Sequence, residues 1–133
     1  MDDIERFICN QQKELYETMQ QEYVDIRKFS DAFMRSRFCN ASIDKPYSVD
    51  QFSDIVNWIE FLEQEFIIQP DPLQKYPVSF SAAGWIGFVY RHLHFVTGLS
   101  SSQLSEMVPV NKLIISYPGL HTIDEDILRR LGL

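Results

Sequence analysis

The chain has 133 residues, 45% of them hydrophobic and 23% charged, which is the composition of an ordinary globular protein. A chain of this length predicts a single domain over residues 1–133. Its 19 acidic residues outnumber its 12 basic ones, and the net charge of −7 argues against nucleic-acid binding because phosphate contacts need clustered Lys and Arg.

The first third of the chain favours helix because no Pro or Gly precedes Pro46. Apolar residues recur there at spacings of three, four and seven, which predicts one buried helix face. The members of this stripe are Ile4, Phe7, Ile8, Leu15, Met19, Tyr23 and Ile26. The pattern leaves open whether residues 2–38 form one helix or two. We favour a break near residues 21–25, because an amphipathic helix of about 40 residues needs an equally long partner.

A second helix is expected after the turn-rich residues 40–47. Ser48-Val-Asp-Gln51 has the form of a capping box, which predicts a helix start at this point. The buried stripe of that helix is expected to be Phe52, Ile55, Val56, Ile59, Leu62 and Phe66. Two prolines within residues 69–72 end it.

Residues 82–97 predict the central buried helix, because this segment is apolar nearly all round. An arginine and two histidines interrupt it, and it is too short for the ~20 apolar residues of a membrane span. Gly84 and Gly87 would let a neighbouring helix approach closely, and Gly98 is a natural C-terminal stop.

The C-terminal part predicts three short helices. Ser100-Ser-Ser-Gln103 is a capping box that opens a helix to about Met107. Residues 110–117 follow and are expected to end at Pro118-Gly119, and Thr122-Ile-Asp-Glu125 forms a third capping box. The predicted fold is therefore an all-α orthogonal bundle of five to seven helices around residues 82–97.

Negative charge is concentrated in one segment. Residues 46–75 contain six acidic residues and one basic residue. A solvated helix face would explain this, and so would a docking surface for a basic partner, because concentrated charge steers association. The candidate partner-binding residues are Asp54, Glu60, Glu63 and Glu65.

A polar cluster is expected on the central helix, where Arg91 and His94 share a face. A buried arginine must find partners, and Glu60 or Asp126 would supply a carboxylate that locks the core. The functional alternative is a small polar pocket to which His121 contributes from the segment before the last helix. The residues assigned to this cluster are Tyr90, Arg91, His94, Tyr117 and His121.

Other chemistry finds little support. His92 and His94 diverge on a helix and no Cys-x-x-Cys occurs, so neither a metal nor a cofactor is expected. Cys9 is expected to be inert core. Cys39 lies near Arg35 and Arg37, which would lower its pKa, but no base lies near it in sequence. Two cysteines and an acidic start without a secretory signal predict a cytoplasmic protein with reduced thiols.

Four stretches carry a resemblance to a known group. They are Phe29-Ser-Asp-Ala-Phe-Met-Arg-Ser36 with Cys39, then Lys45-Pro-Tyr-Ser48, then Trp85-Ile-Gly87 with Tyr90-Arg91, His94 and Thr97-Gly-Leu-Ser-Ser101, and finally His121-Thr-Ile-Asp124. In these the chain resembles a group of small uncharacterised bacterial proteins. Members of the group occur in gene neighbourhoods with ADP-ribosyltransferase-like toxin candidates. The resemblance implies an antitoxin or accessory role and transfers no catalytic residues.

Two functions follow as hypotheses. The first is a non-enzymatic cytoplasmic interaction module that binds another protein, without nucleic acid or membrane, through the acidic helix face. A toxin encoded nearby would be its most concrete partner. The alternative is a small transferase or hydrolase that uses His94 or His121 with Arg91 on an anionic substrate. A homo-oligomer also stays open, and it would require an apolar patch on the first helix.

Overall fold

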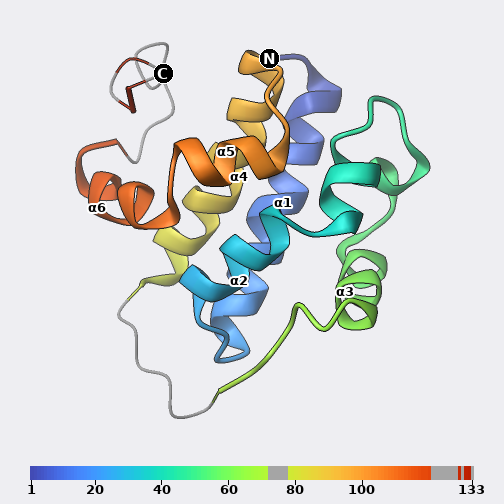
Figure 1. The fold of residues 1–133 in the computed structure, drawn as a ribbon, viewed down its shortest axis with the longest axis horizontal. Helices are drawn as coiled ribbons and strands as arrows, with labels where there is room; N and C mark the ends of the chain where they lie inside the picture. The colour runs from blue at the N-terminus through green and yellow to red at the C-terminus, as the bar shows by residue number, and fades with distance from the viewer. Residues whose placement is uncertain (72–77, 121–128, 130, 133) are drawn as a thin grey trace.

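The computed structural model describes residues 1–71, 78–120, 129 and 131–132, and within them the chain is an all-α helical bundle without strands (Figure 1). This confirms the predicted fold class. The helices are α1 (Asp3–Gln21), α2 (Ile26–Met34), α3 (Ile55–Gln64), α4 (Phe80–Thr97), α5 (Ser101–Met107) and α6 (Val110–Leu120). A π-helical turn, η1 (Cys39–Ile43), and a 3-10 turn, η2 (Val49–Phe52), connect α2 to α3.

The centre of the bundle is the pair α1 and α4, which lie side by side in Figure 1. Most of α4 is buried, as the sequence predicted for residues 82–97. Gly87 makes the close approach possible, because a Cβ atom there would lie 2.6 Å from the backbone oxygen of Gln12 and 2.8 Å from the ring of Tyr16. The expectation that glycines on this helix allow close packing is therefore confirmed at Gly87. None of the helices in the described part of the chain is long and apolar enough to cross a membrane.

The predicted break between α1 and α2 is confirmed. Residues 22–25 separate the two helices, and the side chain of Asp25 caps α2 by accepting the backbone N–H of Arg27 at 3.0 Å. The predicted apolar stripe is only partly correct. Ile8, Leu15, Met19 and Ile26 are buried, whereas Ile4, Phe7 and Tyr23 are exposed. Tyr23 follows the end of the helix with a positive φ of 59°, so the helical spacing no longer places it on the buried face.

The prediction for residues 48–66 is only partly correct. The Ser48–Gln51 capping box forms only in part: the Ser48 hydroxyl accepts the backbone N–H of Gln51, but the Gln51 side chain accepts from Tyr47 and not from Ser48. This cap starts only the short turn η2, and α3 begins afresh after its own cap, Asp54. Ser53 is extended between the two, so the face that continues from η2 is not the face that α3 buries. Leu62 is buried as predicted, Ile55 and Ile59 are half-buried, and Trp58, which was not predicted, is also buried. The expected core residues Phe52, Val56 and Phe66 are 47%, 60% and 80% exposed.

The C-terminal caps are partly as predicted. Gly98 ends α4 with a φ of 72°, and Ser100 and Gln103 form the expected capping box of α5. The predicted stop at Pro118-Gly119 is wrong, since α6 continues to Leu120. A proline in the last turn removes one backbone donor without ending the helix. The third capping box, His121 and Asp126 lie outside the described residues.

Candidate functional site

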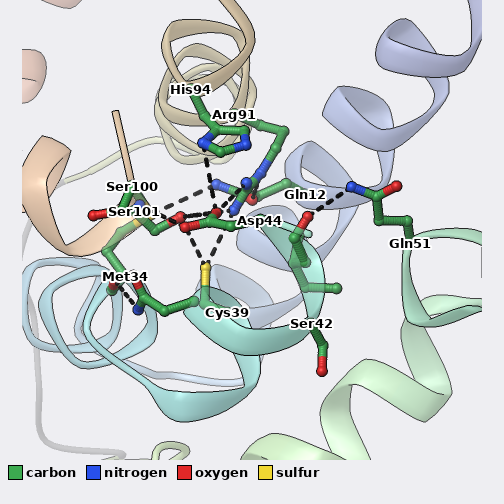
Figure 2. A network of polar contacts seen from close by, with 12 residues as sticks. Gln12, Met34, Cys39, Ser42, Asp44, Gln51, Arg91, His94, Ser100 and Ser101 are labelled. Atoms are coloured by element: carbon green, nitrogen blue, oxygen red, sulfur yellow. Dashed lines mark hydrogen bonds and ion pairs between the residues drawn. The ribbon is translucent and has the colours of Figure 1, made fainter. Parts of the chain in front are cut away.

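The most polar feature of the core is the Arg91 cluster, which comprises Gln12, Cys39, Asp44, Arg91 and Ser101 (Figure 2). The Arg91 side chain is fully buried. Its Nε donates to Oε1 of Gln12 at 2.8 Å and its Nη1 to Oδ1 of Asp44 at 2.6 Å. Its Nη2 donates to Oγ of Ser101 at 3.0 Å and contacts Sγ of Cys39 at 3.1 Å. One guanidinium therefore ties α4 to α1, η1 and α5.

Asp44 is the carboxylate that completes this cluster. It directly follows η1, and its Oδ2 accepts the backbone N–H of Ser101 at 2.7 Å while its Oδ1 accepts the Ser101 hydroxyl at 2.5 Å. The start of α5 thus presents its free N–H to a negative charge, which is the favourable orientation for a helix dipole. The expectation that Glu60 or Asp126 pairs with Arg91 is wrong for Glu60, which is exposed on α3.

His94 lies at the edge of the cluster, one turn after Arg91. Its Nδ1 is 2.7 Å from the backbone oxygen of Leu99 and 3.7 Å from Oδ1 of Asp44. Arg91 and His94 therefore meet at Asp44, as their shared face predicted. His121, the third expected member, lies outside the described residues.

The two tyrosines assigned to the polar cluster lie elsewhere. The hydroxyl of Tyr90 donates to the backbone oxygen of Val108 at 2.6 Å, and so ties α4 to the end of α5. The ring of Tyr117 packs edge-on against Trp85 with centroids 5.6 Å apart. Neither contact involves Asp44, Arg91 or His94.

Burial and the neighbouring side chains together set the pKa values in the cluster. Burial disfavours the charged guanidinium, but Cys39 and Asp44 outweigh it, so the pKa of Arg91 is raised above its ordinary value. Burial raises the pKa of the Cys39 thiol to about 11 and that of Cys9 to about 12. The expectation that Arg35 and Arg37 lower the pKa of Cys39 is therefore wrong, and both thiols stay protonated near neutral pH. The described residues contain no group of three metal-ligating side chains.

A cavity of about 460 Å³ adjoins the cluster. It lies between the first turn of α1, residues 44–51 and the end of α4, and Asp44 and His94 line it. Arg91 does not line it, since the guanidinium lies behind Asp44 and is engaged with the protein. The cluster therefore offers this cavity acceptor groups and no free cation for an anionic substrate.

The acidic segment has a different character. Val56, Glu60 and Glu63 are four and three residues apart on α3, so they occupy one face, and all three are exposed. Asp54 is also exposed, although its side chain caps α3. Glu65, unlike Glu60 and Glu63, is engaged in hydrogen bonds within the protein. Its two oxygens accept the backbone N–H groups of Arg37 and Phe38, each at 2.9 Å.

Gln12, Asp44 and Ser101 were not predicted as members of the cluster. The requirement that a buried arginine find a carboxylate was a valid signal, but Asp44 lies 47 residues from Arg91 and stood out only as part of a turn. Searches of protein-family models, of curated proteins and of solved structures found no match for this chain. Its function is therefore argued from geometry.

Proposed function

We propose that the protein is a non-enzymatic interaction module that binds a basic partner protein through the outer face of α3, defined by Val56, Glu60 and Glu63. The observation that carries the proposal is that an apolar side chain, 60% exposed, shares this face with two exposed carboxylates. Protein interfaces combine a central apolar contact with charged groups around it. The α3 face has both components.

The surroundings of this face support a protein partner. Figure 1 shows α3 at the edge of the bundle, and its outward-facing residues Val56, Glu60 and Glu63 are exposed. Phe61, which stacks on Phe38 at 4.9 Å, is 40% exposed, and Phe66 just beyond the helix is 80% exposed. Exposed aromatic rings are enriched where proteins bind one another. Both rings add exposed apolar surface on α3 or just after it.

Charge determines which partner fits. Residues 46–75 carry six acidic residues and one basic residue, so a basic surface would be attracted and an acidic one repelled. The resemblance noted above makes the product of a neighbouring toxin-like gene the first partner to test, with this protein as antitoxin or accessory subunit in the cytoplasm.

The enzymatic alternative receives less support from the geometry. It needs Arg91 to hold an anionic substrate, but this guanidinium is fully buried and already donates to Gln12, Asp44 and Ser101. An anion would have to displace Asp44 to reach it.

The test is co-purification with the products of adjacent genes, followed by affinity measurement on each complex. We expect Glu60→Lys with Glu63→Lys to weaken binding by about tenfold or more, and the loss to shrink as salt is raised. The matched control is Glu14→Lys with Glu106→Lys, which reverses two exposed charges on α1 and α5. Equal affinity of both double variants and the wild type would contradict the proposal.

A further inference from the structure

The cavity beside Asp44 has the dimensions of a small-molecule site. Its volume of about 460 Å³ falls within the range of typical ligand pockets. Ile4, Ile8 and Phe95 supply apolar walls, and Tyr47 lies in the segment that closes one side. The cavity therefore offers an apolar chain a place to bind away from water.

The charged side chains around the cavity are carboxylates. Three carboxylates line it, those of Asp2, Glu5 and Asp44, and no Lys or Arg is among the described residues of its lining. Arg91 neutralises Asp44 from behind, whereas no cation of the lining faces Asp2 and Glu5. Burial and then the charge of Asp2 raise the pKa of Glu5, with the terminal amine acting in the opposite direction. A cation bound here would relieve the repulsion between the two carboxylates.

His94 adds an acceptor of a different kind. Because the backbone oxygen of Leu99 only accepts, Nδ1 of His94 must carry the proton of the bond between them. The other ring nitrogen, Nε2, is then an acceptor in the neutral imidazole, and it has no partner among the described residues. Carboxylates and an imidazole nitrogen around one apolar cavity complement a ligand that donates hydrogen bonds and carries positive charge.

We propose that this cavity binds a small organic cation, a primary ammonium group on an apolar chain. The ammonium lies against Glu5 and Asp2 within reach of His94, and the chain packs on Ile4, Ile8 and Phe95. A free alkylamine and a lysine side chain of another protein share this chemistry. The site is separate from the α3 face, so neither proposal depends on the other.

The test is titration of the full chain with three six-carbon probes of equal shape, followed by NMR chemical-shift changes. Hexylammonium is expected to bind saturably with a Kd of about 1 mM or tighter, the neutral hexanol at least about tenfold more weakly, and the anionic hexanoate more weakly still. Equal binding of all three probes, or no saturation by hexylammonium, would overturn the proposal.

Variants locate the site. Glu5→Gln is expected to weaken hexylammonium binding by about fivefold or more, whereas Glu14→Gln, which removes an exposed charge elsewhere on α1, leaves it unchanged. Ile4→Trp is expected to abolish binding by filling the cavity, and because Ile4 is 45% exposed the fold should tolerate it, as a thermal melt would verify. Equal effects of the Glu5 and Glu14 variants would overturn the assignment.

A further probe separates the two sources of the cation. Nα-acetyl-lysine amide carries the ammonium on a chain attached to a peptide backbone. Binding comparable to that of hexylammonium supports the proposal with a partner lysine as ligand. Binding of hexylammonium without binding of Nα-acetyl-lysine amide supports the proposal with a free amine as ligand. If neither probe binds, the proposal is overturned.

Discussion

The α1–α4 interface and α3 differ in how much of their side chains they bury. At the interface, Gly87 lets two backbones touch and Arg91 is buried with every partner supplied by the protein. On α3 only Trp58 and Leu62 are buried, and Val56 is left on the surface. The first region is therefore constrained by packing and buried hydrogen bonds, whereas the outer side of α3 is free of such constraints. Substitutions in the two regions should therefore differ in their effect on stability.

Removal of the Arg91 side chain should have the largest effect. Arg91→Ala leaves Asp44 buried without its ion pair, and we expect the free energy of unfolding to fall by about 3–5 kcal/mol. Urea denaturation followed by circular dichroism measures it. The control is Arg35→Ala, because Arg35 and its partner Asp31 are both more than half exposed, and an exposed pair contributes about 0–1 kcal/mol. A loss at Arg91 no larger than at Arg35 would show that the cluster does not stabilise the core.

Gly87→Ala should have the next largest effect. The added methyl group meets the backbone oxygen of Gln12 at 2.6 Å, so α1 and α4 must separate, and we expect a loss of about 1–3 kcal/mol despite the better helix propensity of alanine. Gly84→Ala is the matched control. Its methyl group meets only the flexible side chain of Glu17 at 2.8 Å, so we expect no loss, or a gain of up to about 1 kcal/mol. If both variants melt at the same temperature, the close approach at Gly87 is not what holds the helices together.

The same contrast explains how much of the fold could be predicted from sequence. The break before Ile26, the central helix, the Gly98 stop and the Ser100 cap were predicted correctly because each depends on residues close together in the chain. The buried face of α3 was predicted only in part, since Leu62 is buried but Phe52, Val56 and Phe66 are exposed. The Ser48–Gln51 box is a valid local signal, but the chain restarts a helix at Asp54, and Trp58 then reaches inward to donate its Nε1 proton to the backbone oxygen of Asp50.

The candidate site, too, could be predicted from the sequence only in part. That Arg91 and His94 share a face follows from helical spacing, and that a buried arginine needs acceptors follows from solvation. Which acceptors it finds is decided by tertiary packing, because Gln12, Asp44 and Ser101 come from three other segments of the chain. No periodicity connects these residues, so sequence alone named Glu60 and Asp126 instead.

A smaller effect on stability is expected for His92, which lies on α4. Burial lowers the pKa of His92, and its Nδ1 has no partner among the described residues, so the folded protein favours the neutral ring. The unfolded chain takes up this proton at a higher pH, so the histidine costs stability as the pH falls below about 6.5. We expect the free energy of unfolding of His92→Gln to fall less than that of the wild type between about pH 7.5 and pH 5.5. Parallel pH profiles of the two proteins would show that burial of His92 does not affect stability.

The smallest effect on stability is expected on the α3 face itself. Glu60→Gln with Glu63→Gln should change the free energy of unfolding by less than about 0.5 kcal/mol, because neither side chain is buried. Glu65→Ala, two residues further on, should cost about 1–3 kcal/mol, because the N–H groups of Arg37 and Phe38 lose their acceptor. Urea denaturation of both variants would distinguish the exposed acidic residues of α3 from Glu65, which follows the helix and accepts hydrogen bonds from the backbone. If the Glu60 and Glu63 variant were as unstable as the Glu65 variant, the α3 carboxylates would be part of the fold, and their exposure would no longer argue for a partner.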